Sequence, residues 1–248
     1  MRYRTPARQR ELATICKSCY ALGIVTTANA FQQAMNSNQP YSCENVISVA
    51  DEPHHHLVID TEYVRAYAVE IAPRHRTLCH LHTLPYLLYV AGEAEIVSAP
   101  RNGDAQKHHY FADYCDYASA GLEHIVDNLA DTPFRNLVFE TLPTADQLRR
   151  KGPSSGHAAG LHIAMLYSGD PICAELITLS SGSQADVSGP AVIACPYEET
   201  VEVISPQHGT RKLEHFRDMI HLPDGASGLL RCEAGGPARA LVVTLGCL

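Results

Sequence analysis

The sequence predicts an all-β protein of two tandem barrels, preceded by an N-terminal extension. From about Tyr63 onward, short runs rich in β-branched and aromatic residues alternate with turn residues, without a long stretch of helical periodicity. A polar connector rich in Gly, Ser and Ala, residues 144–160, divides this region into two segments of similar size. The 248 residues suffice for two domains of ordinary size, and 46% hydrophobic residues provide packed cores.

We therefore expect an extension over residues 1–50, a first barrel over 51–143, a linker over 144–160 and a second barrel over 161–248. One larger β-sandwich is the alternative, because the two halves share little direct identity. The expected strands are Tyr63–Ile71, Tyr86–Ala91, Glu93–Ser98, Phe134–Thr141, Cys173–Leu179, Ala191–Cys195, Thr200–Ile204, Gly228–Glu233 and Ala238–Leu245. The dipeptide Asn102-Gly103 predicts a tight turn between two strands.

Charge and hydropathy narrow the class of partner. The formal net charge is -8, and Lys and Arg form no concentrated stripe, which argues against nucleic acid because phosphate binding needs a local positive field. No run approaches the roughly 18 to 20 apolar residues that cross a bilayer. A small-molecule ligand is therefore expected, with no nucleic acid and no membrane span.

The N-terminus and the cysteines bear on the compartment. Basic residues precede the modest apolar stretch 19–25, and Ala28-Asn29-Ala30 has the small-x-small form of a signal-peptidase site. A cytoplasmic protein with a short N-terminal packing helix is expected, and export through residues 1–30 is the alternative. The cysteines number nine, which is odd, and they do not read as a disulfide framework, so we expect mostly reduced thiols, with Cys79 a packed thiol.

Three histidines form the sharpest functional signal. His80 and His82 stand two apart on a predicted strand, so their rings project from the same face. His124 follows a turn at Gly121 and precedes Asn128, and it supplies a third nitrogen from another strand. Three neutral imidazoles suit a first-row transition metal. The sequence thus predicts a metal site on His80, His82 and His124.

These residues resemble the two motifs of the cupin superfamily. Residues 74–92 match the HxH core of the first motif, and residues 113–128 match the second at Gly121, His124 and Asn128. The resemblance implies two cupin barrels of the jelly-roll type, the first of which binds metal. Four positions depart from the motifs: Arg74 and Asp113 replace Gly, Ser119 replaces Pro, and Tyr86 or Leu87 stands where Glu is usual.

Without that carboxylate the site is similar to those of three-histidine cupin dioxygenases. This likeness implies one divalent metal ion per chain, with Fe(II) favoured and Mn, Ni, Zn or Cu as other choices, and no further cofactor. The leading hypothesis is a dioxygenase-like oxidoreductase that acts on a small anionic chelating substrate. The alternatives are a non-oxidative metal-dependent isomerase or lyase, and a non-catalytic metal- or ligand-binding cupin.

Four other residues are candidates for catalysis or substrate contact. Tyr86 stands at the Glu position, and Glu140, at the end of a predicted strand, is the candidate general base. Arg65 and Arg135 could face an anionic substrate, although surface positions are an equally good interpretation. The run His54 to His56 is expected to be solvated or to lie on a barrel rim, and His108 and His109 to be exposed.

The second barrel is expected to lack metal ligands. The stretch after Leu179 has no HxH, and Gly228 stands at the spacing where the His after the Pro223-Asp-Gly225 turn would fall. His208, His215 and His221 lack the spacing of a second site. We expect this barrel to support folding, dimerisation or the rim of the first site. A homodimer is expected, because pairing between chains hides exposed sheet edges.

Overall fold

The computed structural model describes residues 41–148, 160–233 and 235–247. Cys43–Leu248 form one compact unit, which contains both barrels. The expected N-terminal helix or signal segment lies outside the described residues, as does most of the linker. The described part contains no helix that is long and apolar enough to cross a membrane.

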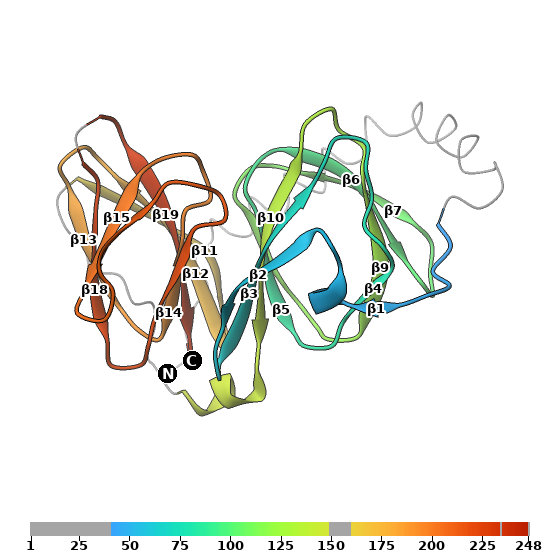
Figure 1. The fold of residues 1–248 in the computed structure, drawn as a ribbon, viewed down its shortest axis with the longest axis horizontal. Coiled ribbons are helices and arrows are strands. Elements are labelled where there is room, and N and C mark those ends of the chain that lie inside the picture. Colours follow the sequence, from blue (N-terminus) through green and yellow to red (C-terminus); the bar gives the residue numbers. More distant parts are fainter. Residues whose placement is uncertain (1–40, 149–159, 234, 248) are drawn as a thin grey trace, which may run out of the picture. The chain divides into compact units, whose positions relative to one another are not determined.

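The first barrel consists of two five-stranded sheets, shown in blue to yellow-green in Figure 1. One sheet has the order β1-β4-β9-β6-β7 and the other has β2-β3-β10-β5-β8. A short 3-10 helix, η1 (Val49–Asp51), joins β1 to β2. The strands are β1 (Ile47–Ser48), β2 (His55–Asp60), β3 (Val64–Ile71), β4 (His80–His82), β5 (Tyr86–Val90), β6 (Ala94–Pro100), β7 (Gln106–Tyr110), β8 (Tyr114–Ala118), β9 (Leu122–Asn128) and β10 (Phe134–Thr141).

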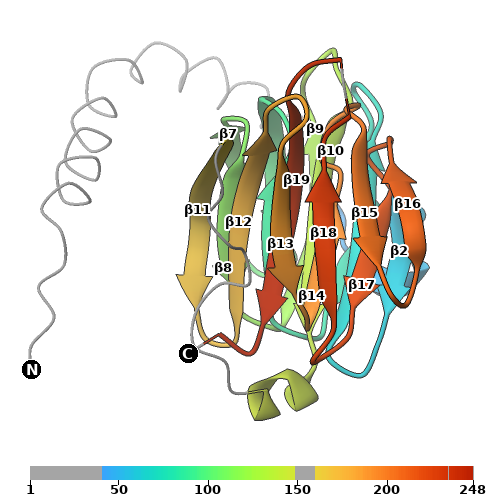
Figure 2. The same ribbon diagram turned by 90° about the vertical axis from the view of Figure 1, so that its left-hand side faces the viewer.

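The second barrel follows a 3-10 helix, η2 (Pro143–Gln147), and has sheet orders β11-β12-β19-β14-β17 and β13-β18-β15-β16. Figure 2 shows the strands of the four-stranded sheet side by side. The strands are β11 (Leu161–Gly169), β12 (Ile172–Leu179), β13 (Gln184–Ser188), β14 (Ala191–Ala194), β15 (Val201–Ser205), β16 (Gly209–Leu213), β17 (Met219–Leu222), β18 (Ser227–Arg231) and β19 (Ala238–Leu245).

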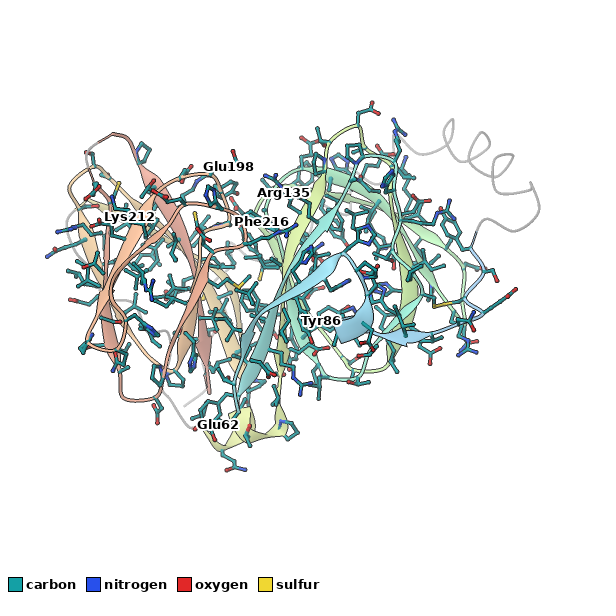
Figure 3. All side chains as sticks on the ribbon, viewed as in Figure 1. Glu62, Tyr86, Arg135, Glu198, Lys212 and Phe216 are labelled. Atoms are coloured by element: carbon teal, nitrogen blue, oxygen red, sulfur yellow. A yellow bond between two sulfur atoms is a disulfide. The ribbon has the colours of Figure 1, made fainter. Side chains whose placement is uncertain are left out.

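A hydrophobic core lies between the two barrels. Leu137 and Phe139 of β10 belong to the same buried cluster as Ile172 of β12 and Val243 of β19, and all four side chains are fully buried. Polar contacts surround it: Arg135 pairs with Glu198 at 3.2 Å and lies over the Phe216 ring (Figure 3). The second barrel therefore supports the outer face of the sheet whose inner face lines the first barrel.

The all-β prediction is confirmed, and two predicted strands, Phe134–Thr141 and Ala238–Leu245, have the observed bounds. The Asn102-Gly103 turn joins β6 to β7, which pair antiparallel. Missed strands include β7, β8 and β16, which lie at sheet edges and have largely exposed or half-buried residues. Their sequences lack the apolar alternation that a buried face imposes.

The expectation of reduced thiols is wrong for one pair. Cys43 and Cys79 form a disulfide, whereas five other described cysteines are not disulfide-bonded. Cys79 directly precedes β4, and the backbone N–H of Ile47 donates to the Cys79 carbonyl at 3.0 Å. The disulfide and the parallel β1–β4 pairing thus attach the segment from residue 43 to the strand that carries the HxH motif.

Candidate metal centre

The two histidine-bearing strands pair as the motif spacing requires. β4 and β9 run antiparallel, and His80 lies directly opposite His124. Their ring centroids are 4.7 Å apart, and the His82 ring is 5.1 Å from that of His80 and 5.5 Å from that of His124. All three side chains are buried. The structure therefore brings the three predicted ligands together inside the first barrel.

A fourth histidine joins them from β2. His55 is buried, and its ring centroid lies 4.7 Å from that of His80 and 5.8 Å from that of His82. The candidate ligand atoms of His55, His80 and His82 all lie within 4.8 Å of one another. His124 flanks this compact group through its contact with His80. We call His55, His80, His82 and His124 the histidine cluster.

The prediction that the run His54 to His56 is solvated or on a rim is therefore wrong for His55. Alternation along β2 turns His55 inward, opposite Val69 of β3, while His54 and His56 are only half-buried. The sequence does contain one signal for His55, the acidic residue Glu52 three positions before it. In the structure the Glu52 carboxylate accepts a hydrogen bond from His55. His55 enters the site through a strand pairing that the motif spacing does not encode.

Glu52 is a buried carboxylate with four hydrogen-bond donors. Its Oε2 accepts from His55 Nδ1 at 2.7 Å and from the His54 backbone N–H at 2.8 Å. Its Oε1 accepts from His54 Nδ1 at 2.9 Å and from the Leu78 backbone N–H at 3.2 Å. Burial alone would raise its pKa, but hydrogen bonds from His55 and His54 outweigh burial and lower the pKa to about 2. Glu52 thus fixes His55 with Nδ1 occupied and Nε2 available.

Two cluster histidines have one ring nitrogen occupied and the other without a partner. His80 Nδ1 donates to the Leu78 carbonyl at 2.9 Å, and His124 Nδ1 pairs with Ser98 Oγ at 3.0 Å. Their Nε2 atoms are buried without a hydrogen-bond partner. Burial lowers the pKa of His80 to about 3 and that of His124 well below its usual range. Both rings are neutral at physiological pH, and their lone pairs are available to a metal.

Glu140 places a carboxylate beside the cluster. Its Oε1 lies 3.7 Å from His82 Nδ1, and both atoms are buried without a hydrogen-bond partner. On β10 it is the register partner of Tyr86, so the carboxylate lies next to the position where the cupin motif has Glu. In the described part of the chain, six buried side-chain polar atoms lack a partner, and four of them belong to His80, His82, His124 and Glu140. Since unpaired buried polar atoms are costly, this concentration fits a bound cation.

Tyr86 packs against the cluster. Its ring stacks on His82 with centroids 4.3 Å apart and an interplanar angle of 27°. Its side chain is buried, and burial raises the pKa of the hydroxyl far above its usual range. A neutral phenol is a poor metal ligand, so Tyr86 positions His82 and forms part of the cavity wall.

The two predicted arginines lie away from the cavity. Arg65 pairs with Asp60 at 3.2 Å, and Arg135 pairs with Glu70 at 2.6 Å. Neither belongs to the cavity lining. The expectation that His108 is exposed is wrong, because its side chain is half-buried and lines the cavity.

At two positions where the cupin motifs have glycine and this sequence does not, the backbone still has the positive φ that favours glycine. Arg74 has φ 60° and Asp113 has φ 64°, and they are the non-glycine residues with positive φ in the described part of the chain. Gly121, which the sequence retains, has φ 95°. Asn128 is fully buried and donates to the carbonyls of Ile71 and Thr132. The motif residues around the cluster therefore build turns rather than bind a ligand.

In the second barrel, the corresponding interior is filled. A Cβ at Gly228, which has the spacing of the motif histidine, would lie 2.9 Å from Leu222 Cδ1. Leu222, Leu230 and Val203 belong to a buried apolar cluster there. Among the residues with described positions, the three-histidine group lies in the first barrel.

Comparison with known proteins supports this architecture. No family model matches the sequence, and no curated protein matches it. Among solved structures, AerE from Microcystis aeruginosa has a TM-score of 0.59 and 13% identity, covering 78% of this chain and 93% of its own. A salicylate 1,2-dioxygenase mutant from Pseudoaminobacter salicylatoxidans has a TM-score of 0.53 and 14% identity, covering 76% of this chain and 75% of its own.

Oxalate decarboxylase from Bacillus subtilis, solved as a point mutant, has a TM-score of 0.53 and 13% identity over 80% of this chain and 76% of its own. At these identities the likeness concerns the fold. The chain therefore has the bicupin fold, with a three-histidine group able to hold a metal ion in its first barrel.

Proposed function

We propose that this chain is a mononuclear metal-dependent cupin enzyme, with Fe(II) as the favoured ion and a dioxygenase-like reaction on a small chelating anion. One observation carries the proposal: buried side-chain atoms of His80, His82, His124 and Glu140 that lack a hydrogen-bond partner gather beside a largely apolar cavity. A divalent iron ion, when bound, supplies Lewis acidity and one-electron redox chemistry. A dioxygenase and a decarboxylase among the structural neighbours are consistent with such a site.

The protein residues have separate roles in this proposal. His80 and His82 hold the ion together with His124 and His55, and Glu52 orients His55 through its Nδ1. Tyr86 packs on His82 and helps to exclude water. Glu140 is the residue available to accept or return a proton, because its Oε1 has no hydrogen-bond partner.

The Glu140 carboxylate, whose Oε1 has no hydrogen-bond partner, also favours a second candidate function. A buried base beside a Lewis-acidic site is the arrangement that a non-oxidative isomerase or lyase requires. The two candidates differ in their need for oxygen. If the protein is a non-oxidative isomerase or lyase, Glu140→Gln should abolish the exchange of substrate protons with solvent. Removal of oxygen should then leave the rate of turnover unchanged.

Metal analysis and oxygen consumption test the proposal. Protein purified without chelators should contain close to one metal ion per chain, and His80→Ala should lose it. His108→Ala, which changes a cavity histidine outside the cluster, is the matched control and should keep the metal. The ferrous protein should consume oxygen slowly alone and faster with a bidentate anion. Full occupancy in His80→Ala would disprove the metal site, whereas unchanged oxygen uptake with every chelating anion would leave the non-oxidative candidate.

The proposal also covers the oligomeric state of the protein and its cellular compartment. We propose a homodimer, because pairing between chains can cover edge strands such as β7 and β16, and light scattering should give twice 27.1 kDa. The Cys43–Cys79 disulfide supports the exported alternative over a cytoplasmic protein, since such bonds persist in oxidising compartments. Thiol labelling of the protein in fractionated cells tests this, and a fully reduced pair in the cytosolic fraction contradicts it.

A further inference from the structure

The cavity beside the histidine cluster has an uneven distribution of charge. It has a volume of about 230 Å³. Apolar side chains from β3, β5, β6, β9 and β10 form much of its wall, including Val69, Leu88 and Val138. Among the described lining residues there is no Lys or Arg, and the one carboxylate is that of Asp116. Apart from a bound metal, nothing described in this cavity neutralises a negative charge.

Asp116 lies at the solvent side of the cavity. It is an exposed residue of β8, opposite Leu88 of β5, and it belongs to the cavity lining. Its Oδ2 accepts a hydrogen bond from the Tyr114 hydroxyl at 3.1 Å, and its Oδ1 accepts from the Tyr117 backbone N–H at 2.9 Å. The carboxylate is therefore held in place on an exposed residue of the cavity lining, whereas the four cluster histidines are buried.

Aromatic rings form the wall next to Asp116. The rings of His108 and Tyr110 are nearly parallel, with an interplanar angle of 3°, and those of Tyr110 and Phe134 differ by 10°. Tyr114 packs against Tyr110 with centroids 4.8 Å apart. Such a wall offers a flat apolar surface to a planar ligand, with a carboxylate beyond it.

We propose, on the basis of the proposed function, that the substrate is a small planar molecule with one chelating anionic head and no second negative charge, and that Asp116 is the residue that enforces this charge selection. The head binds at the metal, which supplies the positive charge. The other end lies against the aromatic wall and meets the Asp116 carboxylate, which repels an anion and accepts a hydrogen bond from a neutral donor. Asp116 is thus a specificity-determining residue that takes no part in holding the metal.

Two probes with the same head group test the selection. Salicylate chelates through its phenolate and carboxylate, and its ring-sulfonated derivative adds a negative charge on the far side of the ring. Full-length protein loaded with Co(II) reports binding at the metal through its visible absorption, independently of turnover. At pH 7.5, we expect wild-type protein to bind salicylate about fivefold or more tightly than the sulfonated probe.

Variants separate charge from size, because the sulfonate is also bulkier. Asp116→Asn should reduce the preference for salicylate over the sulfonated probe about threefold or more. In Asp116→Lys the side-chain charge should attract the sulfonate rather than repel it. Asp104→Asn removes the same charge from an exposed residue between β6 and β7 that does not line the cavity, and it should leave the preference unchanged. Raising the salt concentration should weaken the wild-type preference, since screening acts on exposed charges.

The outcomes are distinguishable. If Co(II) binds and both probes perturb its spectrum with a preference that Asp116→Asn leaves unchanged, the charge selection is wrong and the proposed function stands. If Co(II) does not bind, or neither probe alters its spectrum, the proposed function fails and the selection fails with it. Charge selection by Asp116 is supported if the preference for salicylate over the sulfonated probe falls in Asp116→Asn and persists in Asp104→Asn.

Discussion

Glu52 Oε2 accepts a hydrogen bond from His55 Nδ1 at 2.7 Å, and both side chains are buried. Through its other oxygen, Glu52 also binds the backbone N–H of Leu78, whose carbonyl accepts from His80 Nδ1. One carboxylate thus connects two cluster histidines from different sheets. Carboxylates behind metal-bound histidines orient the ring and raise its basicity.

Glu52→Gln is expected to weaken metal binding about 10- to 100-fold, because an amide cannot accept from all four donors. Competition with a chromophoric chelator measures the affinity. Asp51→Asn, which alters the exposed acidic residue next to Glu52, is the matched control and should bind metal as the wild type does. Equal affinities for Glu52→Gln and Asp51→Asn would show that Glu52 has no influence on the site.

Cys43→Ser is expected to destabilise the protein by about 4 kcal/mol, because the disulfide joins residues separated by 36 positions and restricts the unfolded chain. Urea unfolding with and without reductant measures the difference. Reduction of the wild type should reproduce the loss, and the Cys43→Ser protein should be insensitive to reductant. Cys115→Ser, at a free and half-buried cysteine, serves as the control. Equal stability of oxidised and reduced wild type would contradict the prediction.

Metal-free protein is expected to lose stability as the pH falls from about 6.5 toward 3. Burial lowers the pKa of His80 from 6.5 to about 3, and burial also lowers the pKa values of His55 and His124. In this window the unfolded chain binds protons that the folded chain does not, so the free energy of unfolding rises with pH. Each such histidine contributes a slope of about 1.4 kcal/mol per pH unit.

Calorimetry with a chelator present, at steps between pH 7.5 and about 4, measures this dependence. Below pH 4.5 the lowered pKa of Glu52 also decreases the free energy of unfolding as the pH falls, because protonation of the carboxylate removes its hydrogen bonds. His80→Gln should reduce the slope between pH 6.5 and 4.5. A melting temperature that stays constant across this range would contradict the buried neutral histidines.

Asp113→Gly is expected to destabilise the protein by about 1 to 3 kcal/mol, despite the positive φ that favours glycine. The Asp113 carboxylate accepts from the hydroxyl of Tyr89 in the first barrel at 2.6 Å, and from that of Tyr197 in the second barrel. Arg74→Gly is the matched control, because Arg74 has the same backbone conformation and only an exposed ion pair with Asp131. It should be neutral or slightly stabilising. Urea unfolding compares the two variants, and equal effects would show that the contacts between the barrels contribute nothing.

The amino-acid sequence by itself determined the all-β class, the two-barrel organisation and the facing of His80 and His82. Strand periodicity places residues two apart on one face, and the turn pattern around Gly121 brings His124 opposite His80. The same reasoning predicted the bounds of strands buried on both faces, such as Phe134–Thr141, because burial imposes a continuous apolar run.

Only the tertiary structure decided which other residues join the site. His55 depends on the pairing of β2 with β3, and the Cys43–Cys79 disulfide depends on β1 lying beside β4. Glu140 reaches His82 because its register partner is Tyr86, which no local pattern along β10 indicates. Arg65 and Arg135 carry the charge expected of substrate contacts, yet neither lines the cavity. Arg135 is on the outward face of β10, whereas Arg65 shares the strand face of Val69 but lies near the other end of β3, where it pairs with Asp60. Register between distant strands sets these neighbours, and periodicity within one strand cannot specify it.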